Sequence, residues 1–211
     1  MILLRTALAL GLCAVLLQGC ELALLGAGGA AAMTAMEDRR TAGTQIEDEG
    51  IELRIGNRVS ERFGGKAHVN VTSFNRWVLL TGEVADEASR AQLDKISESA
   101  GNVRGISNEV QVAGISSLGS RANDSFITSK VKARFVEGRR FSPVHVKVVT
   151  EAGVVYLLGV VTQKEADDAV EIARTTDGVR KVVKIFEYCQ TSDEACRPRP
   201  KAPAEAPKPQ S

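Results

Sequence analysis

The fold is decided by a short stretch that occurs twice, Trp77-Val78-Leu79-Leu80-Thr81-Gly82 and Val154-Val155-Tyr156-Leu157-Leu158-Gly159. Both copies are apolar runs that end in glycine, which is typical of a buried β-strand. An alternating strand precedes each copy, around Val69 and Val146, and only a tight turn lies between the strands of each pair. The sequence therefore predicts two β-hairpins of the same design.

Helices are expected on both sides of each hairpin. Before each hairpin, apolar residues recur at every fourth position, which is typical of a helix with one buried face. A more polar helix is predicted after each hairpin, over residues 86–100 and 162–175, and Thr162 with Glu165 has the pattern of a capping box. The recurring apolar positions are Ile51, Ile55, Val59 and Phe63 in the first copy and Ile127, Val131 and Phe135 in the second.

The two copies superpose with a shift of 76 or 77 residues, and each ends in a third strand that begins near Val103 or Val179. The predicted fold class is therefore α+β, with two tandem αββαβ units, each a three-stranded mixed sheet with two helices. We place the first domain at 46–113, a short Gly/Ser linker at 114–122 and the second domain at 123–190. Because a domain of this size buries only about 60% of its chain surface, we expect the copies to stabilise each other.

Gly82 and Gly159 occupy the same place, where the second strand of each copy ends. We expect a positive φ, or a close approach of a helix that a Cβ would block. A glycine that cradles a phosphate is the rival interpretation, but neither copy has a second glycine at the motif spacing.

The N-terminal residues have the pattern of a secretory leader that ends in a lipobox. Residues 1–19 place Arg5 before an apolar run and close on Leu17-Gln18-Gly19, directly before Cys20. Acylation of Cys20 would hold the protein on a bilayer, with residues 20–45 as a tether. An uncleaved transmembrane helix is the alternative, against which the polar Gln18 and Glu21 argue.

Two further cysteines, Cys189 and Cys196, stand at the end of the last predicted strand. In a compartment that permits disulfides we expect them to pair. We expect no metal site, because the only histidines, His68 and His145, lie far from these cysteines in sequence. Residues 191–211 hold five of the six prolines and are predicted to be a disordered tail.

Composition and motifs exclude several functional classes. The formal net charge is +1, which lacks the dominant positive field of a general nucleic-acid-binding protein. The sequence has no Gly-rich phosphate loop, no nucleophile elbow and no His-Glu-x-x-His motif. We therefore expect a protein that is not an enzyme and has no cofactor.

The repeated unit resembles the BON domain, an αββαβ module of bacterial envelope proteins with a characteristic glycine, here Gly82 and Gly159. The most specific part of this resemblance is the run from Ala122 to Val131. A lipobox followed by two such units is similar to the dual BON-domain outer-membrane lipoproteins. The resemblance implies a lipid-anchored protein of the outer membrane that faces the periplasm, supports envelope integrity and is linked to division sites. It also implies that the first helix of the second domain binds anionic phospholipid, of the phosphatidylglycerol or cardiolipin type.

The residues of this helix support the same expectation. Phe126, Lys130 and Arg134 follow one another every fourth position, about 100° around the helix from the apolar stripe. Residues 121–140 carry a local charge of +4, and each well-placed cation contributes roughly 1 kcal/mol at an anionic surface. The first copy has Gly50 where the second has Phe126. The predicted phospholipid-binding residues are Phe126, Lys130, Val131, Lys132 and Arg134.

Three alternatives stay open from the sequence. Phe126 could pack under the preceding linker, with the cations as a solvated face. The protein could be a periplasmic adaptor whose exposed sheet edges dock another envelope or division protein. A module associated with peptidoglycan or a secretin would rest on fold analogy alone.

Overall fold

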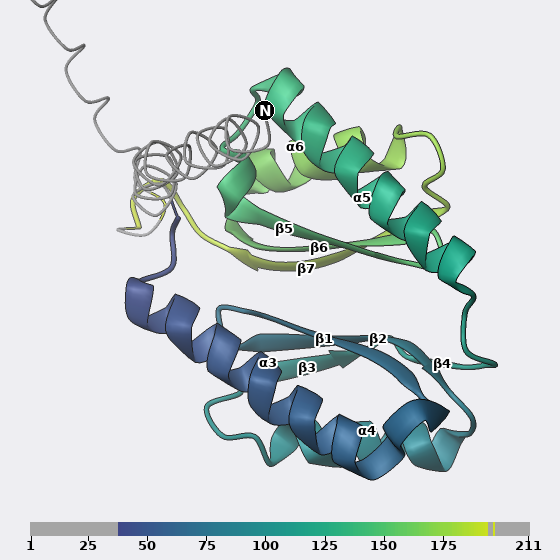
Figure 1. Cartoon of the computed structure of the whole chain (residues 1–211). Coiled ribbons are helices and arrows are strands. Elements are labelled where there is room, and N and C mark those ends of the chain that lie inside the picture. Colours follow the sequence, from purple (N-terminus) through teal and green to yellow (C-terminus); the bar gives the residue numbers. More distant parts are fainter. Residues whose placement is uncertain (1–37, 194–195, 197–211) are drawn as a thin grey trace, which may run out of the picture. The chain divides into compact units, whose positions relative to one another are not determined.

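The computed structural model describes residues 38–193 and Cys196, which form two domains of the same design (Figure 1). The predicted leader, Cys20, the first part of the tether and the proline-rich residues 197–211 lie outside the described residues. The first domain contains α3 (Ala42–Phe63), η1 (Gly64–Lys66), β1 (His68–Phe74), β2 (Trp77–Val84), α4 (Glu87–Glu98), β3 (Gly105–Asn108) and β4 (Gln111–Val112). The second contains α5 (Leu118–Gly138), η2 (Pro143–His145), β5 (Val146–Glu151), β6 (Val154–Val161), α6 (Gln163–Arg174) and β7 (Lys181–Tyr188).

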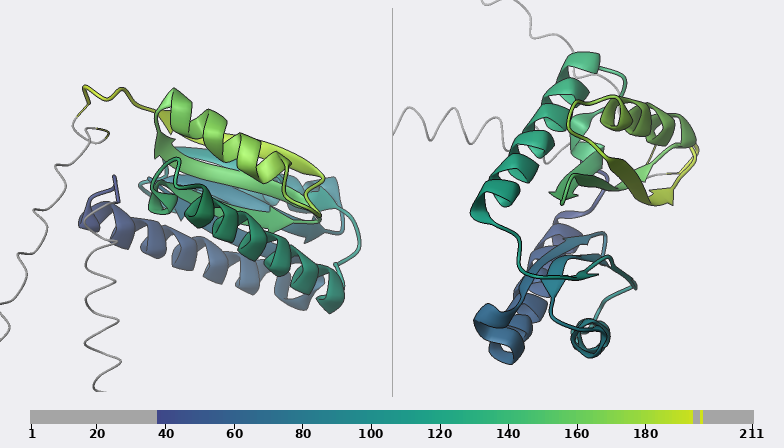
Figure 2. Two further views of the ribbon diagram at one scale, coloured as in Figure 1. Left: turned by 90° about the horizontal axis from the view of Figure 1, so that it is seen from above. Right: turned by 90° about the vertical axis from the view of Figure 1, so that its right-hand side faces the viewer.

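Each domain is an α+β unit with the predicted αββαβ order. In the first sheet β2 pairs antiparallel with β1 and parallel with β3, and in the second sheet β6 does the same with β5 and β7. Two helices cover one face of each sheet, as Figure 2 shows. The apolar stripes of α3 and α5 enter the two domain cores, where Ile51, Ile55, Ile127 and Val131 are at most 1% exposed. The predicted fold class is confirmed.

Helix starts follow from local capping groups. The capping box predicted from Thr162 and Glu165 is present at the start of α6. α5 begins at Leu118, within residues 114–122 that we place in the linker. The Ser117 side chain accepts a hydrogen bond from the Ser120 N–H and so caps this earlier start. Thr41 caps α3 in the same way, within the segment expected to be a tether.

The last strand of the first domain is interrupted, which the repeat pattern did not predict. β3 and β4 both pair with β2, but residues 109–110 lie between them. Val110 turns into the core and is 2% exposed, while its N–H donates to the Asn108 side chain. The first sheet therefore has four strands where three were expected.

Each hairpin turn is held by a buried aspartate from the preceding helix. The turn residues Asn75 and Ala152 have positive φ, as tight hairpins require. Asp48 accepts hydrogen bonds from the N–H groups of Asn75 and Arg76, and Asp124 accepts from those of Ala152 and Gly153. Both aspartates are at most 5% exposed and occupy equivalent positions in the two copies. The recurrence of an aspartate at Asp48 and Asp124 is visible in the sequence, but the apolar stripes do not predict its role.

Gly82 and Gly159 are needed because a neighbouring strand approaches closely. A Cβ on Gly82 would lie 1.9 Å from the carbonyl oxygen of His68, and one on Gly159 would lie 2.4 Å from that of His145. Gly82 also has a φ of 117°. The expected close approach is therefore real, but it comes from the adjacent strand rather than from a helix.

The sheet faces opposite the helices share a third apolar cluster. Phe74 and Leu79 of the first domain pack with Tyr156, Leu158 and Val160 of the second. The described residues from Arg39 onward accordingly belong to one compact unit. Ion pairs border this cluster, among them Lys147 with Glu52 at 2.8 Å and Arg104 with Glu187 at 2.9 Å. Cys189 and Cys196 form a disulfide, and both belong to the same cluster.

Candidate lipid-facing surface on α5

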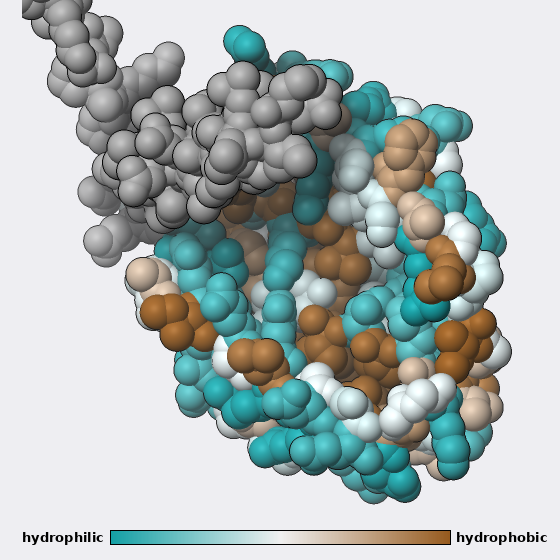
Figure 3. Space-filling view, viewed as in Figure 1, coloured by the Kyte–Doolittle hydropathy of each residue, from teal (hydrophilic) through white to brown (hydrophobic). Residues whose placement is uncertain are grey.

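The outward side of α5 carries exposed apolar residues, between which the polar Ser125, Ser129 and Glu137 also reach the surface. Leu118, Phe126 and Val136 are 78%, 62% and 60% exposed, and the small Ala122 and Ala133 are also exposed on this side. In Figure 3 brown, apolar side chains reach the surface over the N-terminal end of the helix. We call this set, Leu118, Ala122, Phe126, Ala133 and Val136, the α5 outer face. The exposure of Phe126 removes the alternative in which its ring packs under the preceding linker.

Lys130 lies beside the Phe126 ring. Its Nζ is 5.0 Å from the ring centroid and 3.0 Å from a carboxylate oxygen of Asp177. Because the Asp177 side chain is 99% exposed, water weakens this ion pair. The lysine can therefore exchange Asp177 for an anionic headgroup at little cost in free energy.

Arg134 points elsewhere. Its guanidinium donates to the carbonyl oxygen of Ile172 and to the Thr176 hydroxyl, at 2.9 and 2.8 Å, and so ties α5 to the end of α6. The equivalent Arg58 of α3 donates to Ser99, the C-cap residue of α4. An arginine at this position is therefore a scaffold feature of both domains.

Val131 does not belong to the surface. It is 0% exposed and packs in the core of the second domain with Ile127 and Phe135. Its inclusion among the phospholipid-binding residues was wrong, because the helical position that makes it a core residue turns it away from any membrane.

The remaining cations divide into paired and unpaired groups. Arg140 pairs with Asp168 at 3.3 Å. Lys132 and Arg139 are exposed and have no ion-pair partner among the described residues. Lys132 lies on one flank of the α5 outer face and Lys130 on the other, while Arg139 follows the end of the helix as its C-cap. Lysines therefore border this face on both sides, with the exposed Glu137 on the Lys130 side.

α3 provides an internal comparison. It also has two exposed apolar residues, Ile46 and Leu53, at 70% and 65%. It carries five acidic residues against three arginines, whereas α5 carries four basic residues against two acidic ones. Arg54, equivalent to Lys130, donates to the Ala100 carbonyl oxygen and to Glu47. Only α5 therefore combines an exposed aromatic ring with net positive charge.

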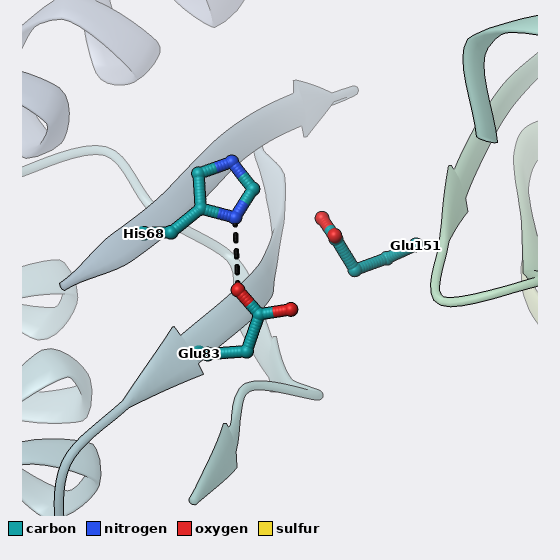
Figure 4. Close-up of side chains that lie close together, drawn as sticks. All are labelled: His68, Glu83 and Glu151. Carbon is teal, nitrogen blue, oxygen red and sulfur yellow. Dashed lines mark hydrogen bonds and ion pairs between the residues drawn. The ribbon is translucent and has the colours of Figure 1, made fainter. Parts of the chain in front are cut away.

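A polar cluster lies at the border of the two sheets, where His68 and Glu83 of the first domain face Glu151 of the second (Figure 4). His68 Nδ1 and Glu83 Oε2 are 3.0 Å apart, and Asn70 donates to Glu151 at 2.9 Å. Burial raises the pKa of Glu151 above its ordinary value, and the charge of Glu83 adds to this effect. The sequence did not predict this cluster.

The equivalent His145 has a different environment. It lies 3.2 Å from Glu165, which also receives two hydrogen bonds from Arg39. Burial by itself would raise the pKa of Glu165, but hydrogen bonds from His145, Arg39 and the Thr162 N–H, with the positive charge of Arg39, hold it well below its ordinary value.

Within residues 38–193, no helix is both long and apolar enough to cross a bilayer.

The model of the BON domain matches residues 47–114 and 123–190. The chain belongs to the BON-domain family. It is 38% identical to the outer membrane lipoprotein DolP of Haemophilus influenzae over 82% of this chain and 91% of that protein. It is 34% identical to the 21 kDa hemolysin of Actinobacillus pleuropneumoniae, over 72% of this chain and 80% of that protein. The osmotically-inducible protein Y of Escherichia coli is 29% identical over 66% of this chain and 72% of its own length. The chain is therefore a DolP-like member of the family.

Proposed function

We propose that this protein is a non-enzymatic lipoprotein of the outer membrane, held by lipid on Cys20 and facing the periplasm, that binds anionic phospholipid through α5. In this role it supports envelope integrity and localises to division sites. The similarity to DolP, an outer membrane lipoprotein, supports the location. The observation that carries the lipid site is Phe126, 62% exposed and beside Lys130 on a helix whose outer face is apolar.

The energetics suit reversible docking rather than insertion. Phe126 has about 60% of its surface available, so burying the ring in the acyl boundary contributes about 2–3 kcal/mol. Lys130, Lys132 and Arg139 each add roughly 1 kcal/mol near an anionic surface. Arg134 contributes through the scaffold, because its Nη1 already donates to Ile172 and Thr176. The lipid-binding set that we propose is the α5 outer face with Lys130, Lys132 and Arg139.

Flotation with liposomes tests this proposal. The full mature chain carrying Cys20→Ser, which removes the acyl anchor, should float with phosphatidylglycerol vesicles and not with phosphatidylcholine vesicles. Phe126→Glu should abolish flotation. The matched control is Leu53→Glu, which places the same charge at an equally exposed apolar position of the equivalent helix. Equal flotation of the Phe126→Glu and control variants would refute the lipid site.

The second candidate is a periplasmic adaptor. It is favoured by β7, an eight-residue strand at the edge of its sheet, which could pair with a strand of another envelope protein. An adaptor needs no headgroup preference. Absence of flotation with anionic vesicles, together with salt-resistant capture of a division or envelope protein, would favour this candidate instead.

A further inference from the structure

Three side chains from three strands converge at the border of the two sheets. His68 begins β1, Glu83 lies directly opposite it on β2, and Glu151 ends β5 in the other domain. Their ligand-type atoms all lie within 4.8 Å of one another. In Figure 4 the Glu151 carboxylate points toward the space beside the His68–Glu83 pair.

This cluster holds more buried negative charge than its partners balance. Glu83 and Glu151 are 6% and 5% exposed. Among the described residues, neither carboxylate forms an ion pair with a lysine or an arginine; Glu83 has His68 and the Ser116 N–H, and Glu151 has Asn70. Buried carboxylates are ordinarily paired with a cation, protonated or bound to a metal ion.

In the second domain, the carboxylate beside the equivalent histidine has a positively charged partner. There the equivalent His145 lies 3.2 Å from Glu165, and Arg39 supplies a guanidinium with hydrogen bonds of 2.7 and 3.0 Å to this carboxylate. At the His68 site no guanidinium pairs with Glu83 or Glu151 among the described residues.

A buried hydroxyl lies beside the cluster. Thr81 is 1% exposed, and its Oγ1 makes no close hydrogen bond among the described residues. Thr81 pairs with Asn70 in the β1–β2 register, on the same sheet face as His68 and Glu83, and its hydroxyl acts on Glu151. A cavity of about 340 Å³ lined by His68, Asn70 and Glu151 gives a path for an ion. Arg121 lines the same cavity but pairs with neither carboxylate.

We propose that His68, Glu83 and Glu151 bind a divalent transition-metal ion of the zinc type, which joins the two domains. One imidazole nitrogen and two carboxylate oxygens are ligands that zinc accepts, with water in the fourth position. Ligands about 2.1 Å from zinc lie roughly 3.4 Å apart, close to the 3.0 Å between His68 and Glu83. Glu151 therefore makes most of the required movement. Binding at Nδ1 requires that the hydrogen shared with Glu83 leave this nitrogen, and in the neutral imidazole it moves to Nε2.

Zinc alone, titrated into the full mature chain by calorimetry at pH 7, tests this proposal. We expect one ion per chain, and a fall in affinity of at least tenfold in His68→Ala and in Glu151→Gln. His145→Ala is the matched control and should bind zinc as the unaltered chain does. Glu151→Gln keeps the shape of the side chain, so we expect this variant to fold. Circular dichroism checks that it does.

Cobalt(II) gives a second measurement that does not depend on any variant. Visible absorption bands of four-coordinate cobalt, displaced by equimolar zinc, are expected for the unaltered chain. Absence of saturable zinc binding up to 1 mM would overturn the proposal. Equal zinc binding by the unaltered chain, His68→Ala and Glu151→Gln would overturn it as well.

Discussion

Replacing Asp124 by alanine should destabilise the second domain by about 3–5 kcal/mol. The Asp124 carboxylate is 5% exposed and accepts hydrogen bonds from the N–H groups of Ala152 and Gly153, at 3.0 and 2.8 Å. A hydrogen bond to a charged group contributes about 1.5–3 kcal/mol, and its loss leaves a shielded donor unpaired. Because Ala152 has a positive φ, the turn also loses the contact that holds this conformation.

Urea denaturation followed by circular dichroism would measure this change, with the m-value as a check on two-state behaviour. Asp124→Asn keeps one acceptor oxygen, so we expect about half the loss. Asp177→Ala is the control: this aspartate is 99% exposed, and its removal should change the free energy of unfolding by less than about 0.5 kcal/mol. A loss below 1 kcal/mol for Asp124→Ala would refute our account of the hairpin.

Three further predictions concern stability. The pKa of Glu165 is lowered from its ordinary value of 4.5, so its charged form stabilises the fold above pH 4.5, and this stability is lost as the pH falls further. Glu165→Gln should therefore make acid unfolding, followed by fluorescence, depend less on pH; an unchanged acid transition would contradict this. Gly82→Ala should cost at least about 3 kcal/mol in chemical denaturation, because its Cβ would overlap the His68 carbonyl oxygen; wild-type stability would exclude the close approach. Reduction of the Cys189–Cys196 disulfide should cost about 2 kcal/mol, read as a lower Tm in dithiothreitol; an unchanged Tm would show that the bond is not structural.

Local sequence patterns predicted most of the fold. The spacing of Ile127, Val131 and Phe135 defines one helix face whatever lies beyond it, and the capping box of Thr162 and Glu165 depends on four residues. The same geometry places Phe126 off this face, but only the structure shows that its ring is exposed. The start of α5 was missed because a single serine cap is a weak signal within a Gly/Ser-rich segment.

The sequence by itself determined the two-domain repeat and the buried faces of the helices, because these depend on residues a few positions apart. The tertiary structure alone decided the partners of Arg134, His68 and Glu151. Arg134 meets residues about 40 positions away, and His68 meets a carboxylate of the other domain. Such contacts between residues distant in sequence depend on strand register and on the packing of one sheet against another, which the periodicity of the sequence does not encode.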